Sequence, residues 1–294
     1  MNKWLLSLLL NAILLSSSHA LDLGKALEDA VKEKIQPSQT TNKPENNETN
    51  KLQDNSSPSI HWKNPSKDEE IGIGRQVTGS LLGAAPLVKD DALQTYVNKV
   101  GRWVASQSER ADLPWKFGVI ESTDLNAFAA PGGYVLITKG LYQKLESESQ
   151  LAGVLGHEIA HVVKKHQLKV MQKQALLSYG AGLLSDQLGE GELTKKAIGT
   201  GAEISARNLD KNAEFEADRM GMILAARAGY DVYGLPEILQ TMGQINHNDD
   251  RVTLLFKTHP LPDERLTKLS ESAGSQLDKL TSGKTLENRL YKLN

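Results

Sequence analysis

Cysteine is the first thing this sequence lacks: none of its 294 residues is one. The absence excludes disulfides, a cysteine nucleophile, thiolate metal ligands and the acylated cysteine of a lipoprotein. A metal site in this chain would have to be built from histidine and carboxylate side chains. An exported form would have to rest on its hydrophobic core alone, which a chain of this length can supply.

A strong net charge is also missing. The chain carries 34 lysines and arginines against 36 aspartates and glutamates, a formal net charge of −2. Without a basic excess or a polybasic run, we expect no nucleic-acid partner and no attraction to anionic lipid. The composition, 39% hydrophobic and 24% charged, is that of a globular protein. At roughly 150 residues per domain, the length suggests one or two domains.

Long apolar runs are scarce, and the one at the amino terminus is short. A lysine precedes Trp4 to Leu15, which is almost wholly apolar, and small residues follow. Ser18 and Ala20 fit the rule for signal-peptide cleavage, so residues 1–20 are predicted to be a signal peptide for export to the periplasm. The alternative is an uncleaved anchor, although a membrane-spanning helix needs about 20 apolar residues. No later run is long enough, so we expect no integral membrane segment after cleavage.

The composition changes twice after the signal peptide. Residues 21–35 have the pattern of a short amphipathic helix. Residues 36–66 are rich in Asn, Ser, Thr, Pro and Glu, and cannot bury enough apolar surface to offset the entropy lost on ordering. We therefore predict a short helix and a disordered linker over 21–66, and one folded domain over 67–294.

The folded part is predicted to be α+β and mainly helical. Two short β-branched runs, at 116–121 and 134–138, indicate strands, and Pro131, Gly132 and Gly133 form a turn before the second. Apolar residues at helical spacing predict helices in the remaining segments. These segments are 93–104, 147–166, 168–206 with a break near 189–192, 210–229, 237–245 and 264–272.

The segment LAGVLGHEIAHVVKKH, residues 151–166, carries the main chemical signal. His157 and His161 lie four residues apart, so both rings leave one face of a helix, as two zinc ligands require. Glu158 would lie beside the open coordination position, where it can accept a proton from water. The alternative is a core helix with incidental histidines. His166, five positions after His161, is off that face and is interpreted as a cation at the helix C-terminus.

A hydrolytic zinc site needs a third protein ligand and a position left open for water. The segment NAEFEADRMG, residues 212–221, places Glu214 and Asp218 on one face of a predicted helix. We expect Glu214 to be the third ligand and Asp218 to accept a hydrogen bond from a ligand imidazole. Glu216 points to the far side and is expected to belong to a solvated acidic face.

Four segments in this order resemble one known family: NAFAAPGGYVLITKGL, LAGVLGHEIAHVVKKH, EFEADRMG and THPLPDERL. The chain is similar to the zinc metallopeptidases that include the HtpX heat-shock protease and the CAAX prenyl protease, and within them to the soluble periplasmic BepA- and LoiP-like branch. The resemblance covers residues 68–270. It implies a zincin-like domain with one zinc ion. It also implies the following site residues: His157, His161 and Glu214 as ligands, Glu158 as the base and Asp218 as a supporting residue.

The resemblance assigns two further residues in THPLPDERL. His259 would approach the metal from a mobile loop and close the water position, as a regulatory ligand. Arg265 would lie near the site and stabilise an oxyanion, as a catalytic residue. The alternatives are a surface turn residue for His259 and an ion pair with Asp263 or Glu264 for Arg265.

Substrate binding is expected along NAFAAPGGYVLIT, because an exposed strand edge can hold an extended peptide by main-chain hydrogen bonds. Asn126, Gly132 and Gly133 are the candidate substrate-binding residues. A turn cap is the alternative role for Asn126.

The sequence therefore predicts a zinc-dependent endopeptidase. Its substrates would be unfolded or misfolded periplasmic and outer-membrane proteins, and it could associate peripherally with the outer-membrane assembly machinery. One alternative is a periplasmic chaperone or assembly factor with a latent zinc site. A second alternative is a zinc hydrolase of small substrates.

Overall fold

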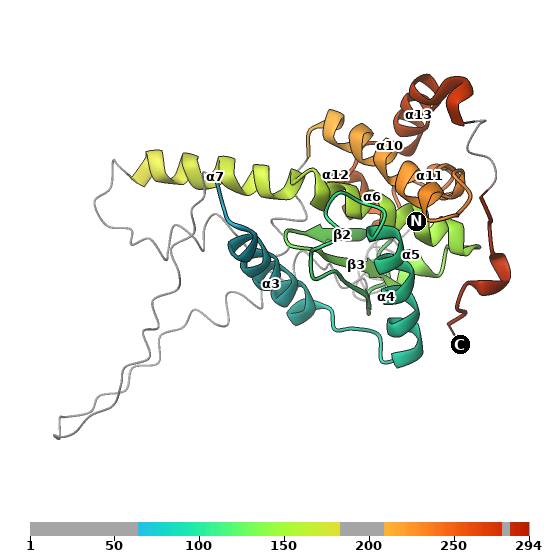
Figure 1. Cartoon of the computed structure of the whole chain (residues 1–294), viewed down its shortest axis with the longest axis horizontal. Helices are drawn as coiled ribbons and strands as arrows, with labels where there is room; N and C mark the ends of the chain where they lie inside the picture. Colours follow the sequence, from blue (N-terminus) through green and yellow to red (C-terminus); the bar gives the residue numbers. More distant parts are fainter. Residues whose placement is uncertain (1–63, 183–208, 278–282, 294) are drawn as a thin grey trace, which may run out of the picture.

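The computed structural model describes residues 64–182, 209–277 and 283–293 (Figure 1). The predicted signal peptide, the helix over 21–35, nearly all of the predicted linker and the break near 189–192 lie outside these residues. Across the described part of the chain, no helix combines the length and apolarity needed to cross a membrane.

A small mixed sheet forms the centre of the fold. Its strands are β1 (Lys116–Ile120), β2 (Ala127–Ala130) and β3 (Tyr134–Thr138), in the order β1-β3-β2. β1 runs parallel to β3, and β2 pairs antiparallel with β3. β3 has the predicted bounds and β1 ends one residue early. This arrangement leaves β2 as an edge strand of the sheet.

Helices cover the sheet and continue beyond it (Figure 1). α3 and α12 were not specifically predicted, and α6 and α7 divide what the sequence suggested was a helix running through His166. The helices are α3 (Lys67–Ala84), α4 (Asp91–Ala105), α5 (Lys139–Tyr142), α6 (Glu148–Val163), α7 (His166–Gly182), α10 (Lys211–Arg227), α11 (Gly234–Gly243), α12 (Asp250–Thr258), α13 (Pro262–Leu277) and the 3-10 turn η2 (Glu287–Arg289). The mainly helical α+β architecture predicted from the sequence is confirmed.

The two faces of the sheet pack against different helices. Phe117, Val119 and Val135 join the main core with residues of α4 and α6. Phe128 and Leu136 point to the other face, into a smaller cluster with residues of α3 and α7. The alternation follows from the two-residue period of a strand. It places both faces of β2 and β3 in the protein interior.

α6 is the central helix, and all of its 16 residues are buried. Ser147 caps its start, since its hydroxyl accepts a hydrogen bond from the Gln150 backbone N–H at 3.2 Å. The Gln150 side chain accepts from the Glu146 backbone and donates to Glu237, so it does not return to the Ser147 backbone to complete a capping box.

Two glycines allow α6 and α10 to cross at close range. A Cβ on Gly156 would lie 2.7 Å from the Gly221 carbonyl oxygen, and one on Gly221 would lie 2.6 Å from the His157 backbone nitrogen. Real side chains would force the helices apart. Gly156 directly precedes the first motif histidine, and Gly221 lies one turn after Asp218. The crossing therefore brings the two motif-bearing segments together.

A buried carboxylate joins α3 to the β2–β3 turn. Glu70 pairs with Arg110 through contacts of 2.7 and 3.0 Å, and Lys165 lies 3.2 Å away. The Gly132 backbone N–H also donates to Glu70, at 3.2 Å. This network anchors the turn on the side of α3.

Candidate metal centre

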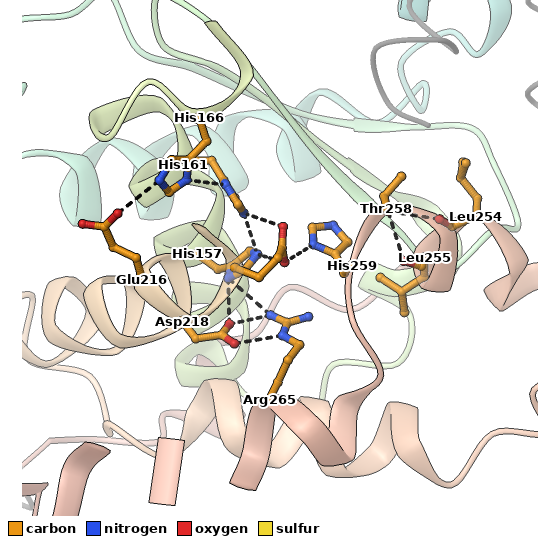
Figure 2. Close-up of polar contacts among 11 residues, drawn as sticks. His157, His161, His166, Glu216, Asp218, Leu254, Leu255, Thr258, His259 and Arg265 are labelled. Carbon is orange, nitrogen blue, oxygen red and sulfur yellow. Dashed lines mark hydrogen bonds and ion pairs between the residues drawn. The ribbon is translucent and has the colours of Figure 1, made fainter. Parts of the chain in front are cut away.

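Four buried side chains converge between α6, α10 and the end of α12 (Figure 2). They are His157 and His161 on α6, Glu214 on α10 and His259, which follows α12. Each offers one ligand atom, and these atoms all lie within 4.8 Å of one another. The structure thus brings together the three predicted ligands and the predicted regulatory ligand.

The carboxylate of Glu214 faces the histidines. Its Oε2 lies 3.7 Å from Nε2 of His157, and its Oε1 lies 3.5 Å from Nε2 of His161. Burial raises the pKa of Glu214, but the charge of His259 and its hydrogen bond to Glu214 outweigh this and lower the pKa, so the carboxylate is ionised. The Nε2 atoms of His157 and His161 are 3.0 Å apart, and both face the Glu214 carboxylate.

Asp218 determines which nitrogen of His157 is free. Its Oδ1 lies 2.8 Å from His157 Nδ1, and its two oxygens accept hydrogen bonds from the Arg265 guanidinium at 2.5 and 2.9 Å. Burial raises the pKa of Asp218, but Arg265 and His157 lower the pKa by more than burial raises it. Asp218 is therefore ionised and only accepts hydrogen bonds. His157 therefore carries its proton on Nδ1, and its Nε2 presents a lone pair.

The donor set fits a zinc ion. Glu214 Oε1 is buried and has no hydrogen-bond partner among the residues that the structure describes. Such an orphaned oxygen is costly unless a cation or donor completes it. Burial lowers the pKa of His161 well below its ordinary value, which keeps this imidazole neutral. Two imidazoles and one carboxylate form the His₂Glu set typical of catalytic zinc.

Glu158 is buried beside this cluster. Burial raises its pKa, and the neighbouring His157 and His259 act in the opposite direction without cancelling the effect. A carboxylate with a raised pKa is suited to hold a proton during a reaction and then release it.

His259 and Arg265 are both buried. His259 is therefore not a surface turn residue. The Nδ1 of His259 donates to Glu214 Oε2 at 2.6 Å. Arg265 pairs with Asp218, while Glu264 pairs with Lys211 instead. Arg265 Nη2 lies 3.3 Å from His157 Nδ1, because both donate to the same oxygen of Asp218.

His166 is not the helix-end cation that the sequence suggested. α6 ends at Val163, Lys165 takes a left-handed φ of 57°, and His166 begins α7. This turn brings the buried His166 ring back, so that its Nδ1 lies 2.9 Å from Nδ1 of His161. Burial lowers the pKa of His166 despite its contact with Glu216, which favours a neutral ring.

Glu216 was predicted to lie on a solvated face, and this holds for only part of its side chain. Its side chain is 41% exposed, and Lys164 contacts its Oε1 at 3.0 Å. The other oxygen, Oε2, lies 3.2 Å from His166 Nε2 (Figure 2). Sequence spacing could not reveal this contact, because it depends on the turn between α6 and α7.

Two pockets border Glu158 and His259. The first is open to solvent and has about 500 Å³ of empty space when the solvent at its mouth is included; its walls are mostly apolar side chains, many of them from α11 and α12, together with Arg265. The second has about 410 Å³ of empty space, again with the solvent at its mouth included, and lies between β2, the α3 side chains Val77 and Leu81, and Thr258. Because Glu158 and His259 line both pockets, the candidate metal centre lies at the junction between them.

The three predicted substrate-binding residues have structural contacts. Gly132 and Gly133 have positive φ values of 76° and 97° in the turn beside α3, and neither lines the two pockets. The N–H of Gly132 donates to Glu70, and both glycines belong to the turn; a substrate contact at Gly132 or Gly133 stays a prediction. Asn126 accepts from the Ala127 N–H, as a cap would, and its buried Nδ2 finds no partner within the described segments.

Comparison with known proteins gives the family context of this geometry. The model of peptidase family M48 matches residues 91–273. The chain is 32% identical over 208 residues to the beta-barrel assembly-enhancing protease of Escherichia coli (strain K12), an alignment covering 67% of this chain and 42% of the relative. The protein of the same name from Yersinia pestis is 32% identical over 210 residues, with 68% and 43% covered.

A more distant relative comes from a eukaryote. The mitochondrial metalloendopeptidase OMA1 of Schizosaccharomyces pombe is 28% identical over 177 residues, covering 60% of this chain and 52% of the relative. The chain spans less than half the length of the beta-barrel assembly-enhancing proteases that it matches.

Proposed function

The chain belongs to peptidase family M48, whose members are zinc-dependent metallopeptidases, and from this premise we propose that it is an endopeptidase acting on unfolded or misfolded proteins. The observation that supports this most strongly is the convergence of two histidines and a carboxylate from separate helices, with a buried glutamate beside them.

His157, His161 and Glu214 would hold one zinc ion. When bound there, zinc polarises a scissile carbonyl and lowers the pKa of water toward about 7. Glu158 then takes a proton from the attacking water and passes it to the leaving amine, a role for which its raised pKa is suited. Asp218 holds His157 in the ligating tautomer, and Arg265 fixes Asp218.

Arg265 also supports the reaction by its place in the pocket wall. It lines the first pocket together with Glu158, so its positive charge lies close to where a carbonyl oxygen would become negative. We propose that it contributes to stabilising this oxyanion, in addition to its ion pair with Asp218.

The substrate would lie along β2 as an extended segment. β2 is an edge strand, and the second pocket runs beside it to Glu158. Pairing through main-chain hydrogen bonds reads backbone more than side chains, which suits unfolded chains. The Asn126 Nδ2 is a candidate donor to such a substrate, since it is buried without a partner in the described regions.

We propose a location and partners on the basis of the amino terminus and the relatives' names. A cleaved signal peptide over residues 1–20 would place the protein in the periplasm. Two relatives are named for beta-barrel assembly, which supports outer-membrane proteins as substrates and a peripheral association with their assembly machinery.

A second candidate function is favoured by His259. Its ring lies at the junction of the two pockets and donates to Glu214 at 2.6 Å. A histidine in this place could act as a further metal ligand and close the water position. The protein would then bind clients as a chaperone or assembly factor with a latent zinc site.

The experiment is a comparison of Glu158→Gln with the wild type. The variant is expected to bind zinc normally and to cleave unfolded casein about 10²–10⁴-fold more slowly, because only the proton acceptor is lost. Glu121→Gln is a matched control on the surface, where Glu121 pairs with Lys139, and should keep both properties.

Casein turnover at the wild-type rate by Glu158→Gln would remove Glu158 from the mechanism. A wild type that binds zinc and protects a client from aggregation, but cleaves nothing until His259→Ala is introduced, would favour the latent-site function instead.

A further inference from the structure

The two predicted ligand histidines, His157 and His161, differ in the side chain that contacts the Nδ1 of each ring, on the side away from the metal cluster. His157 is held directly by the carboxylate of Asp218, at 2.8 Å. His161 contacts a second imidazole, that of His166, through Nδ1 atoms 2.9 Å apart. The far nitrogen of His166, Nε2, contacts Glu216 at 3.2 Å. The three side chains thus form a chain of contacts from the metal cluster to the surface (Figure 2).

Only one assignment of protons gives each contact in this chain a donor and an acceptor. An ionised carboxylate only accepts hydrogen bonds, so His166 must carry its proton on Nε2 and donate to Glu216. The Nδ1 of His166 is then a lone pair, and it accepts from the Nδ1–H of His161. The Nε2 of His161 is left unprotonated, and this is the atom that faces Glu214 and His157.

The opposite assignment fails at both ends. If His166 donated from Nδ1, its Nε2 lone pair would face the Glu216 carboxylate at 3.2 Å. His161 would then carry a proton on Nε2, where a metal ligand needs a lone pair.

We propose that His166 and Glu216 are positioning residues that set the tautomer and ring orientation of His161 for zinc. This inference rests on the proposed zinc site and extends it by two residues. Lys164 lies outside this chain of contacts: its ammonium is 3.0 Å from the other oxygen of Glu216, the one that does not contact His166. The burial of His166 limits competition from water for the contact between the two rings.

The arrangement also explains why α6 must end where it does. The left-handed Lys165 reverses the chain directly after α6, which lets the first residue of α7 reach back to a ring one and a half turns earlier. Glu216 reaches the same histidine from α10, between Glu214 and Asp218. Each ligand histidine is therefore oriented by a residue of the α10 segment, one directly and one through His166.

The test measures zinc affinity by competition with a chelator, and the visible spectrum of the Co²⁺-substituted protein. His166→Leu should weaken zinc binding by about 10–100-fold and alter the Co²⁺ spectrum, as expected when an outer partner of a ligand is lost. His166→Asn can place an amide oxygen near the former Nδ1, and should recover part of the affinity.

Glu216→Ala should weaken zinc binding less than His166→Leu, because the ring contact remains. Lys164→Ala is the matched control: it removes the other partner of Glu216 and leaves the contact with His166, so zinc affinity should stay within about threefold of the wild type. Glu216 and Lys164 are both partly exposed, so these variants should fold even if His166→Leu does not.

The outcomes separate this inference from the function on which it rests. A wild type that binds no zinc overturns both. A wild type that binds zinc, with unchanged affinity and Co²⁺ spectrum in His166→Leu or, if that variant does not fold, in Glu216→Ala, overturns the positioning role alone. Failure of His166→Asn to recover any affinity lost in His166→Leu would also count against the proposed acceptor.

Discussion

Asp218 shows how a single side chain can serve both stability and the metal. It is fully buried, and it accepts from His157 on one side and from Arg265 on the other. Asp218→Ala would leave the guanidinium of Arg265 buried without its counter-ion. We expect a loss of about 3–5 kcal/mol in the free energy of unfolding. Urea denaturation of the metal-free protein measures this loss without any contribution from zinc.

The double variant Asp218→Ala with Arg265→Met provides the control for this prediction. Removing the unpaired charge should restore part of the stability lost in Asp218→Ala. If the double variant were as unstable as the sum of the two single variants, Arg265 and Asp218 would not act as a pair.

Glu70 makes stability depend on pH through a different ion pair. Burial raises the pKa of Glu70, but hydrogen bonding and charge from Arg110, with Lys165, outweigh this and hold it below its ordinary value of 4.5. A carboxylate with a lowered folded-state pKa adds stability above 4.5 that is lost as the pH falls through the folded value. The melting temperature of the wild type should therefore approach that of Glu70→Gln as the solution is acidified. Parallel pH profiles would show that Glu70 is not responsible.

At the scale of elements, the close crossing of α6 and α10 is the feature most sensitive to substitution. Gly221→Ala would place a methyl group 2.6 Å from the His157 backbone nitrogen. α10 would have to move, and Glu214 with it, so zinc affinity and stability should fall together, the latter by about 1–3 kcal/mol. Chelator competition and urea denaturation on one preparation measure both.

Gly79 offers the matched control for this substitution. It lies on the exposed side of α3, and a Cβ there would meet nothing within 4 Å. Gly79→Ala should raise stability by roughly 0.5–1 kcal/mol, because alanine favours the helix. A Gly221→Ala protein that gains stability in the same way would contradict the close crossing.

The helices and strands also differ in how well their own segment of sequence predicts them. β3 could be predicted from its β-branched run and the turn before it, and α10 from its apolar spacing and the capping residue Asp210. β2 consists of three alanines and one phenylalanine, so it carries a weak strand signal and is defined by its pairing with β3. α12 has nine residues, which is short for a helix to be recognised from its periodicity alone.

The candidate site also contains residues that the sequence predicts and residues that only the folded structure brings together. His157, His161, Glu214 and Asp218 share faces of their helices by a spacing of four, which the sequence alone reveals. The contact of His166 with His161 depends on a backbone reversal, and the sequence offers no periodic signal for it. Sequence spacing therefore predicted the inner residues of the cluster and missed the residues behind them.

At the scale of the whole molecule, the site exists only in the folded chain. Arg265 and His157 are 108 residues apart in sequence and both contact Asp218. Figure 1 shows α6, α10 and α12 gathered on one side of the sheet. The residues that line both pockets, Glu158 and His259, lie in α6 and directly after α12. A substrate segment following β2 would pass from one pocket to the other across Glu158.

This geometry predicts a cleavage preference. The first pocket is walled by aliphatic and aromatic side chains next to Glu158, from these residues: Leu235, Ile238, Leu239, Met242, Leu255 and Phe256. Such a wall favours a bulky apolar side chain beside the scissile bond, since each buried methylene contributes about 0.8 kcal/mol. Peptides released from unfolded casein should therefore show leucine, isoleucine, methionine or phenylalanine next to the cut, as read by mass spectrometry.

Leu255→Trp tests the preference because Leu255 is only partly buried and its enlargement would fill the pocket. Cleavage should shift toward sites with glycine or alanine beside the scissile bond, with little change in melting temperature. Leu261→Trp is the matched control, since Leu261 lies on the same stretch of chain, is 45% exposed and does not line the pocket. If Leu255→Trp and Leu261→Trp both kept the wild-type cleavage profile, the side chain beside the scissile bond would have to bind elsewhere, and the second pocket along β2 would be the next place to look.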